Sequence, residues 1–277
     1  MATKGDLNIF RHKWENRMVG VAVLFAILAT IILIALIANH QSAPEWLKAM
    51  VLTAYVTPII ISIFIRYNYW KEVTQAVEVT NKQYPEIYKI FRELVKKGDF
   101  VFMPKLYVKN GNGTLNAFAS KYKLDITKGA YVVVYSDIVD SFYDLGNKDT
   151  LRFVLAHELG HIKLGHVNVR RSVMQGILKP IFLQATFSRA QEYSADRFGA
   201  SITNKIAMPS LSILAAGKRN YERLNVESYI NNDTKKFNRF WMAVVNFQSN
   251  HAVLRRRLAA ARQMDKQGWQ NVHGKML

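Results

Sequence analysis

An uninterrupted run of 21 uncharged, mainly apolar residues, 18–38, constrains this chain more than any other feature. A helix needs about 20 such residues to cross the hydrocarbon core of a membrane. A second apolar stretch, residues 49–65, follows a short connection. Trp46, Tyr67, Tyr69 and Trp70 flank that stretch, as aromatic residues do at membrane interfaces. We therefore expect a two-helix transmembrane hairpin, with residues 1–70 as a membrane anchor.

The distribution of basic residues predicts which side of the membrane the rest of the chain occupies. Lys4, Arg11, Lys13 and Arg17 precede the first span, Arg66 and Lys71 follow the second, and the connection 39–45 has no Lys or Arg. Cytoplasmic flanks carry the excess of Lys and Arg, so both termini and residues 71–277 are predicted to be cytoplasmic. A cleaved secretory signal is the alternative for the first run. Its apolar core would be shorter, and a second span follows here.

The net charge of +18 raises the question of nucleic acid as a partner. The basic residues are scattered in pairs, and only Arg255-Arg256-Arg257 forms a tighter cluster. Because no nucleic-acid-binding motif accompanies them, we predict no nucleic acid and attribute the excess to anionic lipid headgroups. The chain has no cysteine, which excludes disulfides and thiolate zinc sites and fits a reducing compartment.

The pentapeptide His157-Glu158-Leu159-Gly160-His161 fits the H-E-x-x-H pattern of zinc protease helices. Residues four apart on a helix are separated by about 40° in rotation and about 6 Å in rise, so both imidazoles can bind one ion. Glu158 then lies on the flank of that face, close to a metal-bound water.

The alternative is that these polar residues lie on an ordinary surface helix. The surrounding helix is apolar, with Leu151, Leu155, Leu159 and Ile162 on one face, and burying the polar side chains without a partner would be costly. His166 lies about 180° around the same helix from His157. We interpret it as a helix-end histidine and not as a ligand.

A catalytic zinc site needs a third protein ligand, which here must be His, Asp or Glu. The stretch 188–196, with Ser188 as a plausible N-cap, presents Glu192 and Asp196 four apart on one helical face. Glu192 is the best candidate for the third ligand. Asp196 would then orient a ligating histidine through its second ring nitrogen. Such a pair alone usually marks a solvated face.

Taken in order, these motifs resemble the HtpX-like membrane zinc metallopeptidases, relatives of the CAAX prenyl proteases. Leu115-Asn116-Ala117-Phe118-Ala119 resembles the N-A-F-A strand of that family, and His251 with Arg257 resembles its late His-Pro-x-x-x-x-Arg segment. The resemblance covers residues 104–258. It implies one Zn²⁺ per chain with Glu192 as third ligand, a substrate strand beside Asn116, Ala117, Phe118 and Ala119, and His251 or Arg257 near the developing oxyanion.

Two features depart from the family pattern. Ala252 stands where the family has a proline, and residues 172–188 are too few for the additional membrane hairpin that the family usually carries. We read 172–188 as an amphipathic, interfacial segment that caps the active site, with a buried protein helix as the alternative.

The remaining pattern predicts an α+β fold for residues 71–277. One or two helices, broken near Pro85, are expected over 73–97, followed by strands at 106–109, 115–120 and 131–135 and then mainly helices. Together with the resemblance, this pattern leads us to expect a zincin-like (gluzincin) metallopeptidase domain, mainly helical with a small sheet.

The predicted activity is zinc-dependent hydrolysis of peptide bonds, with Glu158 as general base and then general acid. The substrates would be proteins or peptides, among them unfolded membrane proteins in quality control, as the resemblance implies. A specific processing protease for lipidated or signal-bearing substrates and a catalytically silent membrane scaffold are the alternatives. The intact Glu158 argues against the scaffold.

Overall fold

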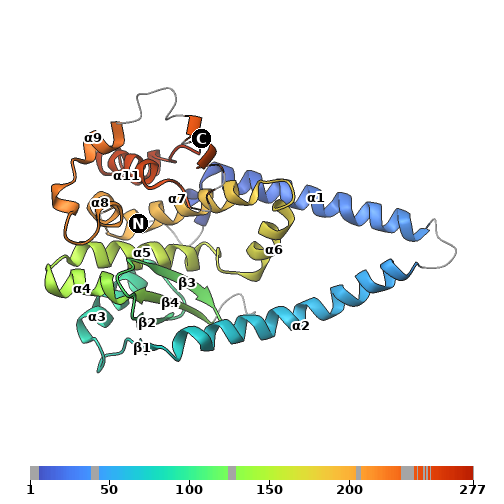
Figure 1. Ribbon diagram of the computed structural model, residues 1–277, viewed down its shortest axis with the longest axis horizontal. Coiled ribbons are helices and arrows are strands. Elements are labelled where there is room, and N and C mark those ends of the chain that lie inside the picture. Colours follow the sequence, from blue (N-terminus) through green and yellow to red (C-terminus); the bar gives the residue numbers. More distant parts are fainter. Residues whose placement is uncertain are drawn as a thin grey trace.

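The computed structural model describes residues 6–38, 44–123, 129–203, 207–231, 240–241, 243–245, 247, 249 and 251–276. Figure 1 shows two long helices, α1 (Lys13–Ala38) and α2 (Glu45–Val73), that project from one side of a globular part. The helices approach each other at their far ends, and most of the predicted connection between them, residues 39–43, lies outside the described residues.

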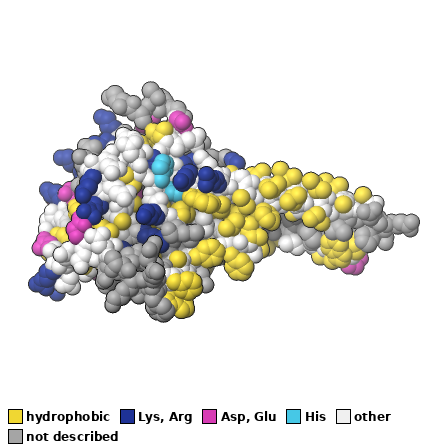
Figure 2. All heavy atoms as spheres, turned by 90° about the horizontal axis from the view of Figure 1, so that it is seen from above, with side chains coloured by type: hydrophobic (Ala, Val, Ile, Leu, Met, Phe, Trp, Pro, Cys, Tyr) yellow, Lys and Arg dark blue, Asp and Glu magenta, His cyan; other side chains and the backbone are white. Residues whose placement is uncertain are grey.

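Among the described residues, one helix, α1, is long and apolar enough to cross a membrane, and the candidate span within it is Lys13–Ala35. Most of its large apolar side chains between Val23 and Ile34 are 40–60% exposed, which suits a helix surrounded by lipid. Figure 2 shows hydrophobic side chains covering the projecting part, whereas Lys and Arg gather on the globular part. The second predicted span, 49–65, lies within α2. Of the two helices in the expected membrane hairpin, only the first is long and apolar enough, among the described residues, to cross a membrane.

The sheet has four strands in the order β1-β2-β4-β3. Strand β4 (Ala130–Tyr135) pairs in parallel with β2 (Lys105–Lys109) and antiparallel with the edge strand β3 (Ala117–Lys121). These three strands lie where the sequence predicts them. The prediction of helices alone over 73–97 was wrong, because β1 (Ala76–Glu78) pairs antiparallel with β2 before α3 (Pro85–Lys97) begins at the proline.

The alternation of side chains along β4 explains how the sheet is covered on both faces. Val132 and Val134 belong to the main core, together with residues of α3 and of α5 (Lys148–Lys163). Tyr131 and Val133 belong to a second cluster around Tyr69, at the base of α2. The base of α2 therefore covers the face of the sheet opposite α5.

Helix α7 (Gln184–Thr203) packs closely against α5. A Cβ atom at Gly160 of α5 would lie 3.2 Å from the backbone of Ala195, and one at Gly199 of α7 would lie 3.3 Å from the backbone nitrogen of His157. The two glycines therefore permit the close approach of the helices. The predicted N-cap at Ser188 was wrong: α7 begins at Gln184, because the buried Phe187 already donates its backbone N–H to Leu183.

Residues 172–188 form the end of α6 (Val169–Leu178), a turn and the start of α7. Met174, Leu178 and Phe187 are buried against Met18 and Ala22 of α1. The buried-helix alternative therefore describes the inner face of this segment. Its outer face carries Val173 and Phe182, which are 50% and 75% exposed.

The remaining helices complete the globular part. Helix α4 (Ser136–Asp144) follows the sheet, and α8 (Ala207–Ala216), α9 (Val226–Asn231) and α11 (Leu254–Gln267) follow α7. Short 3₁₀ turns lie at Leu7–Phe10, Tyr221–Arg223 and Trp269–Asn271. The first of these brings Phe10 into the main core, where its ring packs against Phe198 and stacks on Trp269. Residues before the first span thus pack into the globular part, although the sequence assigns them to the anchor.

Candidate metal centre

Helix α5 presents its two motif histidines toward α7 because its opposite face is held in the core. Asn147 caps the helix by accepting a hydrogen bond from the backbone nitrogen of Thr150. Leu151, Leu155 and Leu159 are fully buried in the main core. His157 and His161 lie on the side of the helix next to this apolar face, and their side chains therefore point between α5 and α7.

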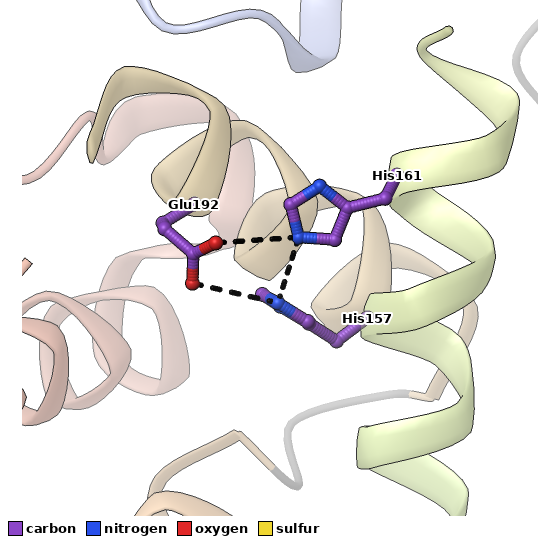
Figure 3. Close-up of side chains that lie close together, drawn as sticks. All are labelled: His157, His161 and Glu192. Carbon is purple, nitrogen blue, oxygen red and sulfur yellow. Dashed lines mark hydrogen bonds and ion pairs between the residues drawn. The ribbon is translucent and has the colours of Figure 1, made fainter. Parts of the chain in front are cut away.

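The three predicted ligands, His157, His161 and Glu192, converge on one point (Figure 3). The two Nε2 atoms lie 3.1 Å apart, and the Glu192 carboxylate oxygens lie 3.4 Å from His161 Nε2 and 3.7 Å from His157 Nε2. For ligands about 2.0–2.1 Å from a tetrahedral ion, the distance between two ligand atoms is about 3.3 Å. The donor set and its spacing therefore fit a zinc ion.

The second ring nitrogen of each histidine faces a residue outside this cluster. His157 Nδ1 lies 2.9 Å from Oδ1 of Asp196, the carboxylate predicted to orient a ligand, but the contact lacks the geometry of a hydrogen bond. His161 Nδ1 lies 2.9 Å from His166 Nδ1. The Asp196 carboxylate favours a proton on His157 Nδ1, which leaves the Nε2 lone pair for a metal. Between His161 and His166 either nitrogen can donate, depending on the tautomer of His166.

Arg257 binds both carboxylates of α7 at once. Its Nε and Nη2 atoms donate to the two oxygens of Asp196 at 2.9 and 2.7 Å, and its Nη1 lies 3.2 Å from Glu192 Oε2. Burial alone would raise the pKa of each carboxyl, but the neighbouring histidines and Arg257 outweigh it. The pKa of Asp196 is lowered, and that of Glu192 lies well below its usual range.

The same carboxylates affect the basic groups. Burial would lower the pKa of His161, but Glu192 outweighs burial and raises it. Burial would likewise lower the pKa of Arg257, and Asp196 and Glu192 raise it. Each buried carboxylate of this cluster therefore faces a cationic or hydrogen-bonding partner.

A cavity of about 540 Å³ opens beside the three ligands. Glu158, 7% exposed, lines it together with the predicted substrate-binding residues Asn116, Ala117, Phe118 and Ala119. Apolar side chains from Ile138, Phe153, Val154, Leu211 and Leu214 line it as well. The candidate base and the sheet edge therefore share one cavity with the metal ligands.

The two candidates for the oxyanion lie differently in this cavity. Arg257 is buried, and its three donor nitrogens all face Asp196 or Glu192, so it is placed to position those carboxylates. The His251 side chain is 74% exposed, with Nδ1 3.2 Å from Glu192 Oε2. The hydrogen bond to Glu192 raises the pKa of His251. Of Arg257 and His251, therefore, His251 has the side chain that a ligand in the cavity can reach.

Two residues lie near the site although the sequence assigned them no role in it, His166 having been interpreted as a helix-end histidine. His166 is buried after the end of α5, where burial lowers its pKa to about 4. Glu15, in the first turn of α1, is fully buried beside it. The five-residue spacing from His161 could have suggested that His166 returns to the site, whereas Glu15 carries no local signal because it is distant in sequence.

Comparisons with known proteins find similarity to a family of peptidases. Residues 81–186 match the model of peptidase family M48, a segment that contains the H-E-x-x-H helix and ends before Glu192. The chain is 28% identical over 180 residues to a "Protease HtpX homolog" of Polynucleobacter necessarius, a match that covers 50% of this chain and 59% of that protein.

Two further relatives carry the same name. One from Helicobacter pylori is 24% identical over 230 residues, covering 77% of this chain and 71% of the relative. One from Pseudarthrobacter chlorophenolicus is 27% identical over 236 residues, a match that covers 69% of this chain and 75% of the relative. No solved structure matches the chain significantly.

Proposed function

We propose that this chain, which is HtpX-like and carries a peptidase family M48 domain, is a membrane-anchored zinc endopeptidase. Residues 1–70 would form the anchor and 71–277 the peptidase domain. The observation that carries the proposal is the convergence of His157 Nε2, His161 Nε2 and the Glu192 carboxylate on one point. The cavity beside that point contains Glu158.

A zinc ion bound by these three residues would supply a Lewis acid and lower the pKa of water. Glu158 takes the proton of the attacking water and later delivers it to the leaving amine. Its low exposure keeps bulk water from competing for that proton. Asp196 orients His157, and Arg257 holds Glu192 and Asp196 in place. His251, at the open side of the cavity, donates to the developing oxyanion.

The edge strand β3 offers a way to hold an extended substrate. Asn116 accepts a backbone hydrogen bond from Tyr135, and Tyr122 donates one to Gly129, so the even-numbered residues bond to β4. Ala117 and Ala119 then direct their backbone groups outward, although the Ala117 N–H already donates to Asn116 Oδ1 at 2.9 Å. A peptide added along this edge would be held by main-chain hydrogen bonds, which recognise extended chain with little sequence specificity.

This mode of binding favours unfolded or unassembled membrane proteins as substrates, and hence a role in quality control. The exposed apolar surfaces of α1 and of Val173 and Phe182 would bring the cavity close to such substrates at the bilayer. A specific processing protease would share the zinc site, and a scaffold would have no use for Glu158. The basic residues around the two long helices favour cytoplasmic termini, a cytoplasmic peptidase domain and contact with anionic headgroups.

The proposal is tested with protein purified in detergent, stripped with a chelator and reloaded with one equivalent of zinc. Wild-type protein should bind about one zinc per chain and cleave unfolded casein only when loaded. His157→Ala, His161→Ala and Glu192→Ala should lose the metal. Full zinc retention in Glu192→Ala would point to Asp196 as the third ligand, and cleavage by the stripped wild-type protein would contradict a metal mechanism.

A further inference from the structure

A row of polar groups leads from the candidate metal site to the base of the membrane helix. Figure 3 shows the second ring nitrogen of His161 directed away from His157 and Glu192. That Nδ1 atom lies 2.9 Å from His166 Nδ1, and His166 Nε2 lies 3.3 Å from Glu15 Oε1. His166 is 8% exposed and Glu15 is fully buried, so bulk water does not provide alternative partners.

The hydrogen positions along this row follow from what each group can donate. For His161 to offer the Nε2 lone pair to a metal, its proton must be on Nδ1, which then donates to His166. Nδ1 of His166 must therefore accept, and its proton lies on Nε2. Glu15 Oε1, which can only accept, lies 3.3 Å from that nitrogen, and its negative charge favours the proton there, although the contact lacks the geometry of a hydrogen bond. One arrangement of protons fits these contacts, and the Glu15 carboxylate defines its direction.

We propose that Glu15 is a positioning residue for the metal site: through His166 it selects the His161 tautomer that presents Nε2 to zinc. The inference rests on the proposed function, because it assumes that His161 is a ligand. Partners that hold a ligating histidine in one tautomer and orientation generally increase metal affinity. Here a second imidazole stands between the carboxylate and the ligand.

The surroundings of Glu15 keep it in place as a carboxylate. Arg171 Nη2 lies 3.0 Å from Oε1, and Arg11 forms an ion pair with the same oxygen. The other oxygen, Oε2, accepts a hydrogen bond of 2.7 Å from Ser194 Oγ on α7. His166 therefore shares Oε1 with two cations, while Ser194 contacts the opposite oxygen.

The position of Glu15 connects the metal site to the membrane anchor. It lies in the first turn of α1, three residues before the apolar run that begins at Met18. Met18 and Ala22 pack on α6 and α7 next to it. A change in how α1 is seated would move the carboxylate at the end of the row, so zinc affinity should depend on that seating.

The experiment measures the zinc dissociation constant of the full chain in detergent by chelator competition. Glu15→Gln keeps the shape of the side chain but can donate toward His166, and it should weaken zinc binding on the order of 10- to 100-fold. Ser194→Ala is the matched control, because it removes a hydrogen bond to the other carboxylate oxygen and should change the affinity less than about 3-fold. In a His166→Phe background, Glu15→Gln should have no further effect.

A second measurement uses the wild-type protein and does not depend on how the variants fold. The ¹⁵N spectrum of its labelled histidines should show a protonated Nδ1 for His161 and a protonated Nε2 for His166. The opposite tautomer of His166, or equal zinc affinity of Glu15→Gln and wild type, would overturn the inference. Absence of zinc binding by the wild-type protein would instead contradict the proposed function.

Discussion

Arg257 and Asp196 form a buried bidentate ion pair beside the candidate metal site, with donor–acceptor distances of 2.9 and 2.7 Å. The pair links α11 to α7, and the same guanidinium reaches Glu192. Arg257 is thus the cation that allows two carboxylates to lie side by side in the protein interior.

Replacement of Arg257 by methionine should leave Asp196 and Glu192 buried without their cation. We expect metal-free Arg257→Met protein to lose about 3–5 kcal/mol of stability, measured by urea unfolding in detergent. Arg262→Met is a control on the same helix, since Arg262 pairs with the more exposed Glu227 and its loss should cost about 0–1 kcal/mol. Equal effects of the two substitutions would contradict this role for Arg257.

The outward backbone N–H of Ala119 is predicted to bind substrate. Ala119→Pro removes that N–H, and an edge strand tolerates proline where the N–H faces away from the sheet. We expect an unchanged zinc content and a fall of about 2- to 10-fold in kcat/KM on casein, the effect of one hydrogen bond. Ala119→Ser keeps the N–H and should cleave normally. If the proline variant cleaves as fast as the serine variant, the substrate does not align along β3.

Stability should fall as the pH is lowered through the range in which free histidine titrates. Burial, with Arg197, His273 and Lys13 nearby, lowers the pKa of His12 to about 4. The unfolded chain takes up a proton near pH 6.5, so between about pH 6.5 and 4 the unfolded state binds more protons. The loss can reach about 1.4 kcal/mol per pH unit for each such histidine.

The pH effect is measured as the melting temperature of metal-free protein between pH 7.5 and 4.5. His12→Gln should flatten the dependence, because glutamine does not titrate. An identical pH dependence in wild type and His12→Gln would show that the buried imidazole contributes nothing to it.

Membrane topology can be tested with single cysteines, since the chain has none of its own. A cysteine at position 42, in the predicted external connection, should react with an impermeant thiol reagent on intact cells. A cysteine at the exposed Asn81 of the globular part should react only after the membrane is opened. The reverse pattern would place the peptidase domain on the outer side.

Local patterns predicted much of the site because its ligands come from two helices. His157 and His161 are four apart, and so are Glu192 and Asp196, which places each pair on one helical face. The strands predicted at 106–109, 115–120 and 131–135 lie within two residues of the observed ones, because glycines separate their apolar residues. Glycines at 160 and 199 give no such signal until the two helices are seen in contact.

What the sequence did not predict depends on contacts between distant segments. The three-residue strand β1 exists through its pairing with β2 and has no periodicity of its own. Glu15 lies in the segment 1–70 that the sequence assigns to the membrane anchor, yet it is buried against His166, Arg171 and Ser194. Charged residues next to a span are usually solvated, so only the tertiary structure shows this one to be internal.

We expect Glu158 to transfer protons beside the metal without binding it. Glu158→Gln keeps the size and hydrogen-bonding capacity of the side chain, so the variant should fold and bind about one zinc per chain like the wild type. Cleavage of casein by the same zinc-loaded preparation should fall by about 10²–10⁴-fold. Wild-type cleavage rates in zinc-loaded Glu158→Gln protein would contradict the account.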